Sequence, residues 1–139
     1  MINELCPNSA KNLHLAPPFY CDYGQFVYAE ENVFINFGAV ILDGGKVKIG
    51  ANTLIAPGVH IYTARHPLDV QARREWEDVA PVVIGKDCWV GGHVTICPGV
   101  TIGDRTVIGA GSVVVKDIPA DCLAVGNPAK VVKKLNQEP

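Results

Sequence analysis

The chain has 139 residues, which is long enough for one domain with a buried core. Its formal net charge of -2 at pH 7 provides no positive potential that would attract nucleic acid. Its apolar residues favour β-branched side chains, with 19 Val and 11 Ile against 8 Leu, and it also carries 14 Gly and 10 Pro. Because β-branched side chains lose rotamer freedom in helices and pack well on pleated surfaces, this composition excludes a helical bundle.

The sequence also bears on the cellular location and on metal chemistry. No apolar run approaches the ~20 residues that cross a bilayer, and the first ten residues lack the basic start and apolar stretch of a secretion signal. We therefore expect a cytoplasmic protein without membrane contact. The five cysteines include no CxxC pair, so they predict plain thiols and no metal site.

Residues 1–19 show no repeat and contain Pro17-Pro18, which predicts an N-terminal arm laid over the first coil of the repeat region.

Residues 20–118 are instead dominated by a period of six. From residue 84 the aliphatic position recurs without a miss, at Ile84, Val90, Ile96, Ile102, Ile108 and Val114. This period matches neither a helix face nor a simple strand, but it fits a triangular coil that closes every eighteen residues, with each recurring side chain pointing inward. We therefore predict a parallel β-solenoid of about four coils, whose strands stack ~4.8 Å apart.

The same register continues upstream with two interruptions. It runs through Ala29, Ile35, Ile41, Ile49, Ile55 and Ile61. The step of eight before Ile49 contains Gly44-Gly45, which predicts a two-residue bulge. The step of twenty-three after Ile61 takes residues 62–80 out of the coil, and this polar segment predicts a long excursion loop of functional importance.

Residues 119–139 form the predicted C-terminal cap. Asn127 is a suitable N-cap for a helix with Pro128 in its first turn, and Lys130, Lys133 and Lys134 follow. A short amphipathic helix here would shield the open edge of the last coil, which would otherwise invite strand pairing.

Three features together indicate a family. The six-residue period, the TARHPLD segment of the loop and the closing GNPAKVV resemble the left-handed β-helix acyltransferases, in particular the maltose and galactoside O-acetyltransferase group. The likeness runs from about Pro17 to Leu135 and implies an all-β, left-handed parallel β-helix, acetyl-CoA as co-substrate, no metal, and a homotrimer with active sites between subunits. The chain departs from the family in lacking most of a helical segment ahead of PPF, and in carrying Gly44 where some members have a second acidic residue.

The resemblance also suggests catalytic and acceptor-binding residues. Transfer of an acetyl group to a hydroxyl needs a base near pH 7, and histidine, with a usual pKa of about 6.5, suits that task. The resemblance gives this role to His66, acting in a direct transfer without a covalent acyl-enzyme, with Glu77 orienting the base. It points to Asn36 and Asp43, and more weakly to Asp22, for binding a small hydroxylated acceptor such as a sugar. Because Asn and Asp are also common turn residues, a purely structural role stays open for these three.

Donor residues follow partly from spacing. Gly92 and Ala110 are eighteen residues apart, so they would stack on consecutive coils and leave a strip on which a pantetheine arm can lie. The resemblance places coenzyme A contacts at these two residues and at Lys116, and sets Trp89 against the donor or the loop. Lys130 and Lys133 are candidates for its phosphates, although solvated lysines are equally expected there.

Three alternatives remain open on the sequence alone. The first is a zinc site built from His60, His66 and His93. Their spacings do not bring all three onto one face of neighbouring coils, so His60 and His93, which lie within the repeat, are interpreted as packing or surface residues. The same solenoid also serves N-acetyltransferases acting on amino sugars, serine or antibiotics. It can also be a binding module without catalysis.

Overall fold

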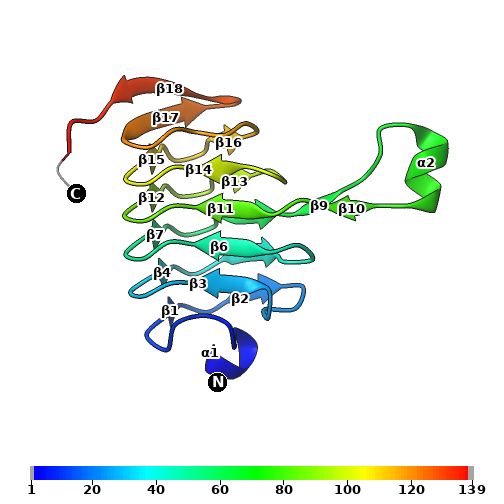
Figure 1. Cartoon of the computed structure of the whole chain (residues 1–139), viewed down its shortest axis with the longest axis horizontal. Helices are drawn as coiled ribbons and strands as arrows, with labels where there is room; N and C mark the ends of the chain where they lie inside the picture. Colours follow the sequence, from blue (N-terminus) through cyan, green and yellow to red (C-terminus); the bar gives the residue numbers. More distant parts are fainter. Residues whose placement is uncertain (1, 138–139) are drawn as a thin grey trace.

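The computed structural model describes residues 2–137 and shows a parallel β-solenoid whose coils stack along one axis (Figure 1). Its strands form three sheets, which we call the first, second and third sides of a prism. The parallel strands of the first side are β1 (His14–Leu15), β4 (Phe34–Ile35), β7 (Leu54–Ile55), β12 (Trp89–Val90), β15 (Val107–Ile108) and β17 (Cys122–Gly126). Those of the second side are β2 (Phe19–Cys21), β5 (Ala39–Leu42), β8 (His60–Tyr62), β13 (Thr95–Ile96) and β16 (Val113–Val114). Those of the third side are β3 (Val27–Ala29), β6 (Val47–Ile49), β11 (Val82–Ile84) and β14 (Thr101–Ile102).

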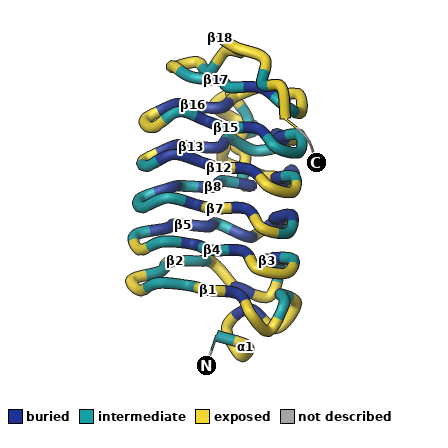
Figure 2. Tube along the Cα trace, turned by 90° about the vertical axis from the view of Figure 1, so that its left-hand side faces the viewer, coloured by how far each residue is buried: buried dark blue, intermediate teal, exposed yellow. Residues whose placement is uncertain are grey.

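The register of the strands confirms the six-residue period. Ile35 pairs with Ile55, Ile55 with Val90, and Val90 with Ile108, so equivalent positions of successive coils lie over one another. Every recurring aliphatic residue predicted to point inward is buried. Figure 2 shows buried residues alternating with exposed ones along the coils. The core is therefore a stack of Ile and Val side chains, as the composition predicted.

The number of coils differs from the expectation. Six parallel strands on the first side mark about six coils rather than four. The additional strands are β1, inside the predicted arm, and β17, inside the predicted cap. Both pair in parallel with a neighbouring coil although their segments lack the six-residue pattern, because backbone hydrogen bonding extends the stack where side-chain repetition ends. Of the arm, only the short helix α1 (Ile2–Leu5) and the turns after it lie outside the coils.

The excursion predicted at residues 62–80 is present but begins later, because Tyr62 still belongs to β8, and residues 64–79 project from the stack (Figure 1). At its base, β9 (Ala64–Arg65) and β10 (Asp78–Val79) pair antiparallel. Its tip carries the helix α2 (Val70–Glu75), whose N-cap Asp69 accepts a hydrogen bond from the Ala72 amide at 2.9 Å. The predicted loop is therefore an ordered hairpin.

The predicted C-terminal helix is wrong. Residues 129–134 form β18 (Ala129–Lys134), which pairs antiparallel with β17 after a turn at Asn127 and Pro128. The helix prediction relied on the local Asn-Pro signal, but the open edge of β17 offers backbone partners, and Val131 and Val132 are β-branched residues that favour a strand. The lysines of this segment lie on the new edge strand, where charge discourages further strand addition.

No helix in the described range 2–137 is long and apolar enough to cross a membrane.

Candidate active site

The hairpin at residues 64–79 sets His66 opposite Glu77. Its register pairs Arg65 with Asp78, and the Arg65 guanidinium donates two hydrogen bonds to the Asp78 carboxylate, at 3.1 and 2.8 Å. This hydrogen bonding lowers the pKa of Asp78. The next residue on each strand is then His66 and Glu77, whose Nε2 and Oε2 atoms lie 3.4 Å apart. An exposed histidine beside a carboxylate can take up a proton and be held in one orientation while it does so.

His66 and Glu77 line a shallow hollow of about 360 Å³ on the hairpin. The rest of its lining comes from α2 and the residue after it, namely Arg73, Arg74, Glu75 and Trp76. These four residues were not predicted from the sequence, because the segment around them shows no regular pattern. The complementary pairs Arg65-His66 and Glu77-Asp78 were a signal for the hairpin, since they face each other in an antiparallel register.

Asp22 and Gly44 lie at the base of the hairpin, at the corner between the second and third sides. A Cβ atom on Gly44 would lie 3.5 Å from Val79 Cγ1 and 3.9 Å from Asp22 Oδ2. Asp22 is exposed, and within residues 2–137 no hydrogen bond to its carboxylate is found. The Asp22 carboxylate therefore borders the open position at Gly44, beside the strand β10 that follows Glu77.

Asp43 differs from the expectation that it faces an acceptor. It is 0% exposed, and its carboxylate accepts hydrogen bonds from the backbone amides of Asp22, Tyr23 and Phe26. This leaves Asp43 no exposed atom with which to contact a solute in this structure.

Asn36 lies at a different corner, between the first and second sides. Its side-chain oxygen accepts a hydrogen bond from the Phe37 amide at 2.8 Å, so its NH2 group is left to donate. Asn36 borders a mostly apolar hollow of about 360 Å³ that also involves Pro57 and the half-exposed Trp89. Because β5 separates this corner from that of the hairpin, one chain does not bring Asn36 and His66 together.

The predicted donor strip is at the same corner as Asn36. The register of β12 and β15 places Gly92 beneath Ala110, and the Gly111 amide donates to the Gly92 carbonyl at 2.8 Å. Trp89 points outward from β12 on the neighbouring side. Lys130 follows the β17–β18 turn above this strip, since it pairs with Val125.

Two other predicted donor contacts lie apart from this strip. Lys116 follows β16 at the far end of the second side, and Lys133 pairs with Leu123 toward the other end of β17. The structure thus groups Gly92, Ala110, Trp89 and Lys130 near one corner. Lys116 and Lys133 are exposed but do not share that corner.

The remaining histidines have packing contacts. His60 Nδ1 lies 2.6 Å from the Tyr62 hydroxyl on the second side. His93 covers Gly58, where an added Cβ would come within 2.6 Å of His93 Nδ1. Within residues 2–137 no three His, Cys, Asp or Glu side chains gather in a geometry that fits a metal ion.

Four of the five thiols have a raised pKa, which is the opposite of what an activated nucleophile requires. Burial raises the pKa of Cys6 to about 11, with smaller contributions from Cys21 and Asp43. Burial likewise raises the pKa of Cys21, Cys88 and Cys97. Because the thiolate is the reactive form, these four groups are less reactive than a solvent-exposed cysteine.

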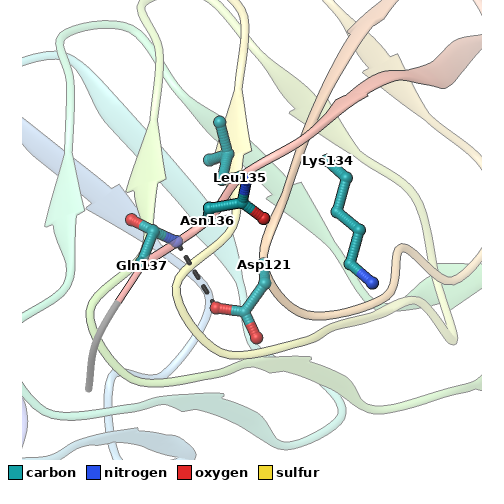
Figure 3. A pocket seen from close by; sticks show the side chains of 5 residues that line it. All are labelled: Asp121, Lys134, Leu135, Asn136 and Gln137. Carbon is teal, nitrogen blue, oxygen red and sulfur yellow. Dashed lines mark hydrogen bonds between the residues drawn. The ribbon is translucent and has the colours of Figure 1, made fainter.

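A further hollow of about 390 Å³ lies under the C-terminal tail (Figure 3). Gln137 Nε2 approaches Asp121 there at 3.4 Å, and Arg105 donates two hydrogen bonds to the same carboxylate, which lower the pKa of Asp121. The Gln137 contact fastens the tail to the solenoid, and the Arg105–Asp121 pair joins two neighbouring coils. Among the described residues, the lining of the hollow contains no histidine or cysteine.

Comparison with known proteins agrees with this fold. Residues 81–116 match the family model for the bacterial transferase hexapeptide (six repeats). The chain is 42% identical to galactoside O-acetyltransferase of Escherichia coli K12 over 98% of its own length and 68% of that protein. It superposes on a maltose O-acetyltransferase from Clostridium difficile 630 with a TM-score of 0.95 and 47% identity, covering 98% of this chain and 73% of the other. A hexapeptide-repeat acetyltransferase from Vibrio cholerae, solved with acetyl coenzyme A, gives a TM-score of 0.92 and 40% identity over 98% of this chain and 75% of the other.

The chain therefore belongs to the hexapeptide-repeat acetyltransferases and is an acetyltransferase related to the maltose and galactoside O-acetyltransferases.

Proposed function

We propose that the protein transfers an acetyl group from acetyl-CoA to a hydroxyl of a small acceptor, a sugar, with His66 as the general base. The observation that carries the proposal is the His66–Glu77 pair at 3.4 Å, on an ordered hairpin. Acetyl-CoA is the donor because the Vibrio cholerae relative was solved with it. The acetylation of a hydroxyl rests on the relation to the maltose and galactoside enzymes.

The proposed reaction is a direct transfer. The acceptor oxygen attacks the thioester carbonyl carbon while His66 removes the hydroxyl proton, and Glu77 stabilises the resulting imidazolium. The tetrahedral intermediate then collapses, the C–S bond breaks, and His66 returns the proton to the leaving thiolate. The products are the acetyl ester and free CoA. The raised pKa of Cys6, Cys21, Cys88 and Cys97 supports a route without an acylated cysteine.

The donor and acceptor sides are proposed from their placement. The strip of Gly92 and Ala110, with Trp89 beside it, offers a surface without bulky side chains for the pantetheine arm. Lys130, and more remotely Lys116 and Lys133, supply positive charge for the CoA phosphates. Asn36 and Asp22 provide the amide and carboxylate groups that orient acceptor hydroxyls.

A homotrimer with active sites between subunits is part of the proposal. Asn36 and His66 occupy opposite ends of the second side, so a site containing both needs His66 of one chain and Asn36 of its neighbour. The projecting hairpin supports this arrangement, because Leu68 is 95% exposed and Trp76 is 53% exposed. Apolar side chains on an outlying arm are typical of a contact with another subunit.

Replacement of the base is the first test. We expect His66→Ala to lower kcat for CoA release by about 10²- to 10⁴-fold, the usual contribution of a general base. Glu77→Gln should give a smaller loss, and the control His14→Ala, an exposed histidine stacked on Phe34, should keep wild-type kcat. Near-wild-type turnover by His66→Ala would contradict the assignment. Mass analysis of products from paired hydroxyl and amino sugars distinguishes O- from N-acetylation.

A further inference from the structure

Asp43 is a carboxylate buried in a position where burial is costly. It follows β5 at the corner between the second and third sides and is 0% exposed. An ionised carboxylate in such a place needs hydrogen-bond donors to compensate for the loss of water. Here all three donors are backbone amides: Oδ1 accepts from Asp22 at 3.2 Å and Tyr23 at 2.9 Å, and Oδ2 accepts from Phe26 at 3.1 Å.

The three amides belong to one segment, residues 22–26, which we call the Asp22 turn. Hydrogen bonds to a charged acceptor are stronger than neutral ones, so Asp43 fixes the backbone of this turn from below. The Asp22 turn carries the exposed Asp22 carboxylate, whose Oδ2 faces the open position at Gly44. The location of Asp22 thus depends on a side chain one coil further along.

The coil of Asp43 is also tied to the start of the hairpin that bears His66. The Thr63 hydroxyl donates to the Leu42 carbonyl at 2.6 Å and accepts from the Gly45 amide at 2.8 Å. Thr63 immediately precedes β9. Hydrogen bonds therefore join the Asp22 turn to Asp43, and join the chain neighbours of Asp43 to the base of the hairpin.

We infer that Asp43 is a positioning residue for the acceptor: its buried carboxylate holds the Asp22 turn so that the Asp22 carboxylate borders the acceptor position at the base of the His66 hairpin. This inference rests on the proposed function. It gives the acceptor contact to Asp22 and gives Asp43, a carboxylate one coil away, an indirect role without contact with the acceptor.

The test compares Asp22→Asn, Asp43→Asn and the double variant with Asp104→Asn as a matched control. Asp104 also accepts a backbone amide, from Lys86 at 2.8 Å, but at the corner between the third and first sides. The probe is whichever of maltose, glucose and galactose gives the fastest CoA release. Because a hydrogen bond to a charged group is worth enough for about a tenfold change, we expect Asp22→Asn and Asp43→Asn each to raise KM for the sugar about tenfold. KM for acetyl-CoA should stay within about twofold of wild type, because the donor strip lies at another corner.

Two further readouts separate positioning from a general loss of stability. Hydrogen exchange at the amides of Asp22, Tyr23 and Phe26 should accelerate in Asp43→Asn, because the side-chain NH2 group replaces one of the two oxygens that accept their hydrogen bonds. It should not change in Asp104→Asn. The double variant should have the sugar KM of Asp22→Asn alone, because Asp43 acts through Asp22.

The outcomes that overturn the inference are distinct from failure of the proposed function. The positioning role of Asp43 is overturned if the effects of the two substitutions on the sugar KM multiply in the double variant. It is also overturned if Asp43→Asn accelerates hydrogen exchange but leaves the sugar KM unchanged. Neither outcome contradicts acetyl transfer. An equal rise in both KM values overturns the positioning role too, since that indicates general damage. A wild-type chain that releases no CoA with any of the three sugars overturns the proposed function, and the inference with it.

Discussion

Burial governs the reactivity of single residues in this protein, and Cys6 shows it most clearly. The side chain is 1% exposed, and burial raises its pKa to about 11 from an ordinary value near 9. The folded protein therefore keeps the Cys6 proton at pH values where the unfolded chain loses it.

This pKa predicts a loss of stability in alkali. The contribution of Cys6 is fully present below pH 9 and is lost as pH rises through 9 to 11, since the unfolded state then binds fewer protons. The loss amounts to at most about 2 to 3 kcal/mol. Urea unfolding at pH 8 and pH 10.5 should show a smaller decline for Cys6→Ala than for wild type, and equal declines would contradict the prediction. Mass spectrometry after iodoacetamide at pH 8 should find Cys6 unmodified in the folded protein.

The placement of candidate residues was predictable only where a motif and its geometry agree. His66 and Glu77 were both selected from the sequence, and the structure brings their side chains together. Asp43 was selected on the same basis but faces inward. Its orientation was open to prediction, because Ile41 points inward and strand side chains alternate with a period of two. The hydrogen bonds that make its burial tolerable come from a segment about twenty residues earlier, and no local pattern indicates them.

At the scale of elements, the corners of the solenoid depend on residues in the left-handed backbone region. At the corner between the third and first sides, Asn32 has a φ of 60° and Asn52 a φ of 63°. Their side chains form a ladder, in which Asn12 donates to Asn32 at 2.6 Å and Asn32 donates to Asn52 at 3.2 Å. Asparagine tolerates this conformation better than most residues other than glycine.

We predict that Asn52→Ala is less stable than Asn52→Gly. Both variants lose the amide hydrogen bond, but alanine at positive φ costs about 1–2 kcal/mol, whereas glycine loses about 0.5–1 kcal/mol through chain entropy. The difference of roughly 0.5–1 kcal/mol should appear as a lower urea midpoint for Asn52→Ala at an unchanged m-value. An alanine variant as stable as the glycine variant would show that the corner relaxes without strain.

The elements at the two ends show why local signals were insufficient. Pro128 after Asn127 is a common helix start, yet the segment pairs with β17 as a strand. At the other end, His14 and Leu15 belong to no repeat and still pair with β4. Both results follow from the unpaired backbone groups at an open end of a solenoid, which are satisfied by whichever segment reaches them. Tertiary pairing of this kind depends on which strand is adjacent, and sequence spacing alone does not give it.

For the whole molecule, the solenoid and its long loop could be predicted from the sequence because the inward aliphatic residues recur every six positions from Ala29 to Val114, apart from two interruptions. The register placed Gly92 and Ala110 on consecutive coils, and strand pairing confirms that placement. It also placed residues 62–80 outside the stack. What it could not provide was the separation of Asn36 and His66 at different corners, because that depends on where the long loop leaves the prism.

That separation leads to the last prediction, which concerns the assembly. If each site takes His66 from one chain and Asn36 from its neighbour, His66→Ala and Asn36→Ala should each be nearly inactive alone but complement each other when co-refolded. With equal amounts and random assembly of a closed ring, about a quarter of the sites receive both intact residues, so about a quarter of wild-type CoA release should return. Light scattering during size-exclusion chromatography should give the mass of a trimer for each variant and for the mixture.

Co-refolding His66→Ala with Glu77→Ala is the matched control. Both residues lie on one hairpin, so every hairpin in the mixture carries one of the two defects. The CoA release of this mixture should therefore not exceed the average of the two variants alone. Absence of recovery in the first mixture, with trimers formed, would contradict a site shared between His66 of one chain and Asn36 of its neighbour.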